Sequence, residues 1–151
     1  MVEIISYEAK YQPDFYRLNV AWLDKYNLTE SHDLAILNDP QGMIIDHGGF
    51  IWLAKEDGKI VGSAALIKEP GEKFELAKMA VDDGYKGKGI SKLLIEACIS
   101  KAKEVGAEKL ELFSNSQLTT ALSLYEKYGF KHVSVTGSPF ETADVKMEME
   151  L

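Results

Sequence analysis

The chain has 151 residues, of which 46% are hydrophobic and 27% charged, and its formal net charge is −7 at pH 7. This length suits one compact domain, and the composition is that of an ordinary soluble globular protein. No apolar run approaches the ~20 residues of a membrane-spanning helix, and the scattered lysines make no broad basic face for nucleic acid. We therefore predict a single domain over residues 1–151 with neither membrane nor nucleic-acid partners.

Cysteine and histidine usage predicts a reducing compartment and no metal centre. Cys98 is the only cysteine, so no intrachain disulfide can form. The N-terminal residues MVEIISYEAKYQ lack the basic-then-apolar layout of a signal peptide, so we expect a cytoplasmic protein. The three histidines show no metal-ligand spacing, and we expect Cys98 to pack in the core.

Apolar periodicity and turn residues predict the order of helices and strands. Asp57-Gly58 is a strong two-residue hairpin signal between two of the strands. The predicted strands are 3–7, 49–55, 59–68, 74–81, 109–114, 131–135 and 145–151. The predicted helices are 12–26, 31–37, 89–105 and 116–128.

The central strand–helix–strand unit, 74–81, 89–105 and 109–114, requires a parallel pair of strands. Meandering strands precede this unit and a β-pair follows it. We therefore predict an α/β fold with a mixed, mostly antiparallel sheet of six to seven strands and helices on both faces.

The stretch DDGYKGKGISK, residues 82–92, leads from a strand into the long central helix. The first N–H groups of a helix lack intrahelical partners, and the helix dipole adds about half a positive charge there. Gly87 and Gly89 let an anion approach the backbone closely. Mobile positive charge comes from Lys86, Lys88 and Lys92. The stretch therefore indicates a site for phosphate or pyrophosphate.

Two familiar phosphate motifs do not fit this loop. A P-loop counted from Gly84 needs lysine where Ile90 stands, and a dinucleotide fingerprint counted from Gly87 needs glycine at Lys92. The six residues from Lys86 to Ser91 instead resemble the [QR]-x-x-G-x-[GA] loop of the GNAT superfamily of N-acyltransferases. Lysine replaces the usual Gln or Arg, and serine replaces the usual Gly or Ala.

The resemblance extends to the flanking segments, over about residues 48–151. LAKMAV (76–81) resembles the fourth strand of the superfamily. Asn115, followed by LYEKYGF (124–130), resembles its second signature. The resemblance implies a GNAT fold and transfer of an acetyl group from acetyl-CoA to a primary amine by direct attack.

The resemblance also implies which residues hold coenzyme A. The pantetheine arm would lie along the main chain of Met79, Ala80 and Val81, and the pyrophosphate on Lys86, Gly87, Lys88, Gly89, Ile90, Ser91 and Lys92. Asn115 would contact the cofactor, although it could also cap the helix that follows it.

Catalytic roles are expected for Tyr125 and Glu75. The resemblance makes Tyr125 the acid at the leaving sulfur, although the stripe of Leu118, Leu122 and Tyr125 also suits a core tyrosine. Strand alternation predicts Glu75 on the same side as Met79, where it would be the base, and Lys78 on the opposite side. A solvated strand-edge charge is the alternative for Glu75.

The sequence allows either a small-molecule amine or a peptide amine as the acceptor. It also allows a homodimer. Glu30 and Asp33 are candidates for binding the amine, because the first two helices of this fold often form a wall of the acceptor site. The alternative function is a non-catalytic acyl-CoA-binding or regulatory domain of the same fold.

Overall fold

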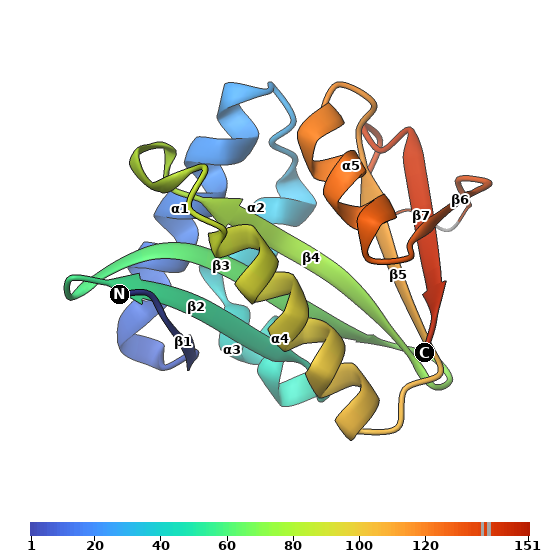
Figure 1. Cartoon of the computed structure of the whole chain (residues 1–151), viewed down its shortest axis with the longest axis horizontal. Helices are drawn as coiled ribbons and strands as arrows, with labels where there is room; N and C mark the ends of the chain where they lie inside the picture. The colour runs from blue at the N-terminus through green and yellow to red at the C-terminus, as the bar shows by residue number, and fades with distance from the viewer. Residues whose placement is uncertain (137, 139) are drawn as a thin grey trace.

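The computed structural model describes residues 1–136, 138 and 140–151. It contains a seven-stranded sheet in the order β1-β2-β3-β4-β5-β7-β6, in which only β4 and β5 are parallel (Figure 1). The strands are β1 (Glu3–Ser6), β2 (Phe50–Glu56), β3 (Lys59–Glu69), β4 (Lys73–Val81), β5 (Lys109–Ser114), β6 (Lys131–Val133) and β7 (Val145–Glu150).

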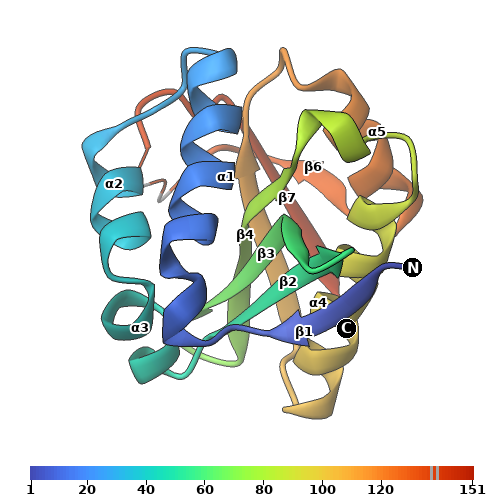
Figure 2. The same cartoon turned by 90° about the vertical axis from the view of Figure 1, so that its left-hand side faces the viewer.

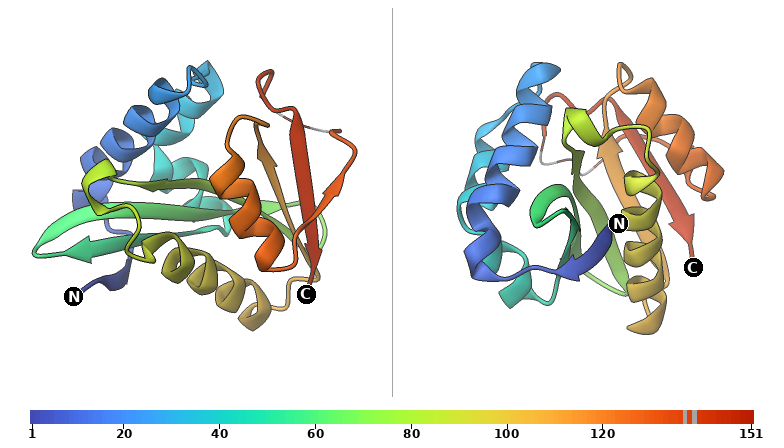
Figure 3. Two further views of the ribbon diagram at one scale, coloured as in Figure 1. Left: turned by 45° about the horizontal axis from the view of Figure 1, so that its top comes forward. Right: turned by 60° about the vertical axis from the view of Figure 1, so that its left-hand side comes forward.

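Helices cover both faces of the sheet (Figure 2). The α-helices are α1 (Gln12–Lys25), α2 (Ser31–Asn38), α3 (Pro40–Met43), α4 (Ile90–Glu104) and α5 (Thr119–Lys127). The 3-10 helices are η1 (Ala9–Tyr11), η2 (Ile45–His47) and η3 (Asp83–Tyr85). The first three α-helices lie on one face and the last two on the other, as two further views also show (Figure 3). Within the described residues, no helix is both long and apolar enough to cross a membrane.

The predicted fold class is confirmed, and most predicted elements lie within a residue or two of the observed bounds. The Asp57-Gly58 hairpin is confirmed by positive φ angles of 52° and 77° at its two turn residues, as a type I′ turn requires. Pro40 follows α2 and is the first residue of α3, because proline suits a first helical turn.

The helix predicted over 116–128 starts later than expected, at Thr119. The residues before it form a turn instead. The Asn115 side-chain oxygen accepts a hydrogen bond from Gln117 N at 3.1 Å, and the N–H and hydroxyl of Ser116 donate to the Asp144 carboxylate at 2.8 and 2.7 Å. These bonds compete with helical ones, so the chain enters α5 three residues late.

An extra residue in β4 changes which side chains face which layer. Lys78 has a φ of 53°, and the β3–β4 register shifts there, so β4 contains a bulge. Before the bulge, Phe74 and Leu76 join the core beneath α4; after it, Met79 and Val81 pack against that same core. Without the bulge, alternation would send Met79 and Val81 toward α1 and α2.

A buried chain of hydrogen bonds holds the bulge. Asn19 Nδ2 in α1 donates to Phe15 O at 2.9 Å and to Ser63 Oγ at 3.0 Å. Ser63 Oγ in β3 then donates to the carbonyl oxygen of Lys78 at 2.8 Å. Asn19 and Ser63 are 2% and 0% exposed, so water cannot replace these bonds.

Replacing Asn19 with alanine should destabilise the protein by about 1–3 kcal/mol, since Ser63 Oγ loses the buried N–H group that donates to it. Asn38→Ala is the matched control: Asn38 also donates to the carbonyl four residues earlier, at 2.8 Å, but at the surface. Urea denaturation should show a lower midpoint for Asn19→Ala alone, with unchanged slope. Equal midpoints for the two variants would contradict this account.

Candidate functional site

Strands β4 and β5 pair at one end only. Their paired residues stop at Glu75 and Glu111, and beyond that level the two strands separate (Figure 1). The separated part contains a cavity of about 110 Å³ with walls from both strands, α1 and α5. Glu75, Met79, Asn115 and Tyr125, which the sequence places far apart, all line this cavity.

The loop after β4 presents the start of α4 to solvent. Gly87 and Gly89 both have a φ of 79°, in the left-handed region that favours glycine. An added Cβ at either glycine would meet no protein atom within 4 Å, so the space above the loop is open. No side chain caps α4, and the N–H groups of Ile90, Ser91 and Lys92 therefore lack intrahelical partners.

The lysines of this loop differ in their contacts. Lys86 Nζ forms an ion pair with Asp83 Oδ1 at 2.9 Å, and Lys88 Nζ lies 5.0 Å from the centre of the Tyr85 ring. Lys92 is exposed and has no ion pair among the residues described. Lys88 and Lys92 are thus the side chains most available to an anion at the start of α4.

Tyr125 directs its hydroxyl toward the wall of the cavity. Its only hydrogen bond among the described residues is to Met79 Sδ, 3.9 Å away. Burial, with a smaller contribution from the Cys98 thiol, raises the pKa of Tyr125 to about 12, so the hydroxyl keeps its proton near neutral pH. Tyr125 also packs edge-on against Phe130 at 5.9 Å, which holds the ring in place.

Glu75 is a buried carboxylate, 5% exposed. Burial first, and then the charge of Glu69, raise its pKa from 4.5 to about 8. Among the residues that the structure describes, no ion pair reaches Glu75. The alternative interpretation of Glu75, a solvated charge at the edge of a strand, is therefore wrong.

The bulge corrects the predicted orientations along β4. Glu75 faces α2 while Met79 packs toward α4, so the two do not share one side. Lys78, predicted opposite Glu75, faces α2 as well and forms a buried ion pair with Asp33. Strand alternation fails here because one inserted residue reverses it.

Asn115 is engaged with the backbone. Its Nδ2 donates to Thr142 O at 2.8 Å and its Oδ1 accepts from Gln117 N. Because α5 starts only at Thr119, Asn115 is not the cap of that helix. Its side chain fixes the approach to β7 and lines the cavity wall.

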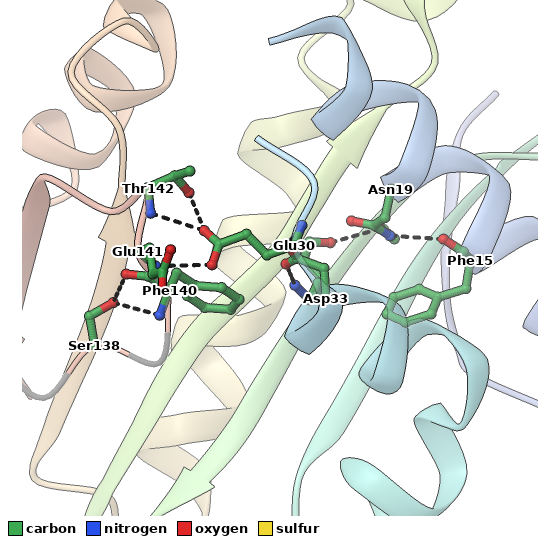
Figure 4. Close-up of polar contacts among 10 residues, drawn as sticks. Phe15, Asn19, Glu30, Asp33, Ser138, Phe140, Glu141 and Thr142 are labelled. Carbon is green, nitrogen blue, oxygen red and sulfur yellow. Dashed lines mark hydrogen bonds and ion pairs between the residues drawn. The ribbon is translucent and has the colours of Figure 1, made fainter. Parts of the chain in front are cut away.

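Glu30 and Asp33 both have partners within the chain, which the sequence did not indicate. The Glu30 carboxylate accepts the N–H groups of Glu141 and Thr142, at 2.9 and 3.0 Å, and the Thr142 hydroxyl (Figure 4). Asp33 accepts the N–H of Glu30 at 2.9 Å and pairs with Lys78. Glu30 therefore fastens the segment before β7 to the start of α2, and neither carboxylate is available for an amine.

Cys98 is fully buried in the core beneath α4. Burial raises the pKa of its thiol, so the thiolate that a nucleophile needs does not form near neutral pH. The thiol belongs to the packing, as predicted.

Known proteins share this architecture. A GNAT acetyltransferase domain model matches residues 29–151. The N-acetyltransferase YvbK of Bacillus subtilis is 32% identical over 105 residues, 68% of each chain. The N-acetylaspartate synthetase of Xenopus tropicalis is 38% identical over 89 residues, 58% of this chain but only 33% of the synthetase.

Solved structures show the same fold. A GNAT acetyltransferase from Staphylococcus aureus superposes with a TM-score of 0.93 at 23% identity, covering 100% of this chain and 99% of that one. The PaiA N-acetyltransferase of Thermoplasma acidophilum, solved with coenzyme A, gives 0.78 at 20% identity, covering 100% and 99%. Since the domain match takes in most of the chain, the protein belongs to the GNAT family of acetyltransferases.

Proposed function

We propose that the protein transfers an acetyl group from acetyl-CoA to a primary amine by direct attack, without an acyl-enzyme. One observation carries the proposal: the parted strands β4 and β5 enclose a cavity that brings Glu75 and Tyr125 to one place. The same strand β4 continues into the glycine-rich start of α4, where an anionic group can bind.

The residues present fit coenzyme A. The unpartnered N–H groups of residues 90–92, the open space above Gly87 and Gly89, and the free ammonium groups of Lys88 and Lys92 suit a diphosphate. Residues 79–81 of β4 have no paired residue in β5, so their main chain is free to bond the pantetheine arm. The Thermoplasma relative that was solved with coenzyme A has the same fold.

When bound, acetyl-CoA supplies a thioester: the amine nitrogen bonds to the acetyl carbon as the C–S bond breaks, giving an acetamide and the free thiol. The main-chain N–H of Met79 polarises the carbonyl oxygen. The Tyr125 hydroxyl, still protonated, donates to the sulfur as negative charge develops there. Met79 Sδ is its only protein partner among the described residues, so the hydroxyl can turn to this task.

In its deprotonated form, Glu75 accepts the proton that the substrate ammonium must lose before the amine attacks. An alkyl ammonium has a pKa near 10.4 in water, and a base with a pKa of about 8 is far better matched to it than an ordinary carboxylate. Burial also lowers the pKa of an ammonium that lies close to Glu75, which favours the neutral amine. Positioning in the cavity adds to the rate.

Replacing Gly89 with alanine should weaken coenzyme A binding roughly ten-fold, because a side chain there strains the loop and occupies the diphosphate space. Gly106→Ala is the matched control: Gly106, just beyond the other end of α4, has a φ of 81° and an equally open Cβ position. Calorimetric titration with coenzyme A is the measurement. Equal binding by both variants would place the diphosphate elsewhere, and no binding by the native protein would overturn the proposed function.

Replacing Tyr125 with phenylalanine should lower kcat about 100-fold with acetyl-CoA and an amine, because the leaving sulfur loses its donor. Tyr128→Phe, just after the end of the same helix, should leave kcat almost unchanged, since the Tyr128 hydroxyl donates to Glu96 at the surface, at 2.7 Å. Release of the CoA thiol measures the rate. If no amine is acetylated while coenzyme A still binds, the alternative, a non-catalytic acyl-CoA-binding domain, is supported instead.

Glu75→Gln should change how stability depends on pH. The pKa of Glu75 is raised from 4.5 to about 8 in the fold, so the folded state holds a proton that the unfolded state loses. Stability therefore falls as pH rises from 4.5 to about 8, and the glutamine variant should escape this fall. Thermal melts should agree at low pH and favour the variant above pH 8, whereas Glu72→Gln, exposed on the same hairpin, should follow the native protein.

A further inference from the structure

A second cavity, of about 300 Å³, lies between the sheet and α2, and three glutamates line it. Strand register places them. Ile67 of β3, Glu75 of β4 and Glu111 of β5 stand in one row across the three strands. Glu69 lies two residues farther along β3, on the same face of the sheet. It is therefore a diagonal neighbour of Glu75, within reach of a long side chain.

Glu69 and Glu75 share a hydrogen bond between their carboxyl groups. Ionised carboxylates offer only acceptors, so one of the two groups must keep its proton. Burial, the charge of Glu69 and this hydrogen bond together raise the pKa of Glu75 to about 8. Burial raises the pKa of Glu69 too, but the hydrogen bond acts on it in the opposite direction. Near neutral pH the proton is therefore on Glu75, which donates to the Glu69 carboxylate.

Two lysines favour the negative charge on Glu69. The charges of Lys73 and Lys146 oppose the effect of burial on its pKa, and both lysines also reach Glu111 Oε1, at 2.8 and 3.9 Å. Glu69 is half-buried, whereas Glu75 is 5% exposed. The ionised member of the pair is thus the one that has cations nearby and partial access to solvent.

The other titratable groups around Glu75 come from α2, β4, β5, β7 and α5. They are His32, Asp33, Lys73, Lys78, Glu111, Tyr125 and Lys146. Lys78 is paired with Asp33, and the ring of His32 packs edge-on against Phe140 at 5.0 Å. The charge of Glu111 acts on Glu75 less than that of Glu69 does. Glu69 is therefore the neighbour with the strongest influence on the Glu75 carboxyl.

We propose that Glu69 is the positioning residue of the base: its carboxylate holds the Glu75 carboxyl by one oxygen and sets how strong a base Glu75 is in acetyl transfer. The inference rests on the proposed function, in which Glu75 is the base. Glu75 lines both cavities, and Glu69 lines the second. A bond from one Glu75 oxygen to Glu69 leaves the other oxygen for the substrate between β4 and β5.

Glu69 makes proton transfer to Glu75 more favourable. When Glu75 is ionised, two negative charges stand within hydrogen-bonding reach, and their repulsion disfavours this state. The substrate ammonium then gives its proton to Glu75: the N–H bond breaks, the electron pair stays on nitrogen, and an O–H bond forms on Glu75. That O–H restores the hydrogen bond to Glu69. The repulsion therefore ends in the same step that makes the amine a nucleophile, and Glu75 returns the proton to solvent before the next turnover.

The titration of Glu75 tests this coupling without any acceptor. Carbon NMR of isotopically labelled glutamate carboxyl groups measures its pKa, and the signal missing from Glu75→Gln identifies the residue. In the native protein Glu75 should titrate at about pH 8. Glu69→Gln should lower this pKa by about one unit or more, because a charge within a few ångströms moves a carboxyl pKa by about 1–3 units. The new amide can also donate to the Glu75 carboxylate.

Two further variants separate charge from general disturbance. Glu69→Asp keeps the negative charge and should retain most of the raised pKa of Glu75. Glu72→Gln removes the same charge from the exposed turn between β3 and β4, and should leave Glu75 titrating as in the native protein. An unchanged pKa of Glu75 in Glu69→Gln, or equal shifts in Glu69→Gln and Glu72→Gln, would overturn the proposal.

The pH dependence of acetyl transfer should follow the same pattern. The assay uses acetyl-CoA and the fastest of three primary amines, which are butylamine, 1,4-diaminobutane and Nα-acetyl-lysine. In Glu69→Gln the acid limb of the kcat/KM profile should move to lower pH, as the NMR titration does. At alkaline pH kcat/KM should be about three- to ten-fold lower, because a weaker base accepts the proton less readily. A purely structural role of Glu69 would instead lower kcat/KM equally at every pH.

The two levels of inference can fail separately. If an amine is acetylated and the pKa of Glu75 is the same in the native protein and in Glu69→Gln, the role of Glu69 is wrong and acetyl transfer stands. If the pKa of Glu75 falls in Glu69→Gln but none of the amines is acetylated, the carboxyl pair stands and the proposed function is wrong.

Discussion

The single extra residue at Lys78 is the constraint on which the rest of the site depends. It reverses the side-chain alternation of β4, so that Glu75 and Lys78 face α2 while Met79 and Val81 face α4. A non-glycine residue with a φ of 53° is unfavourable by itself. The buried bonds that run from Asn19 through Ser63 to the Lys78 carbonyl, and the ion pair of Lys78 with Asp33, compensate for that cost. Helices α1 and α2 thus fix the geometry of a strand that belongs to the central sheet.

The same arrangement sorts the buried charges into two kinds. Lys78 and Asp33 neutralise each other, and Glu111 has two lysines near it, so these groups are structural. Glu75 forms no ion pair among the described residues, and burial, followed by the charge of Glu69, raises its pKa to about 8. Folding alone does not favour this, because a buried acidic group without an oppositely charged partner destabilises the protein. Perturbed groups of this kind cluster at functional sites, and Glu75 lines the cavity between β4 and β5.

The proposed cofactor loop could be predicted from sequence, whereas the surroundings of Glu75 could not. The loop 86–92 is a local feature: glycine positions and a helix start specify it within a few residues. The role proposed for Tyr125 came from the similarly short segment LYEKYGF, residues 124–130. Glu69 and Glu111, by contrast, meet Glu75 only through strand register, and the bulge that turns Met79 away from the side of Glu75 depends on Asn19, more than fifty residues earlier. In the sequence Asn19 is one polar residue in an amphipathic helix, with no signal of its partner in β3.

Glu30 joins two segments that are distant in sequence. Its carboxylate links the start of α2 to residues 141 and 142, and this contact places Phe140 and Thr142 at the cavity between β4 and β5. One wall of that cavity therefore depends on two distant segments, whereas another belongs to β4 and β5 themselves. Changes in either segment can reshape that wall without disturbing β4, the bulge or the start of α4.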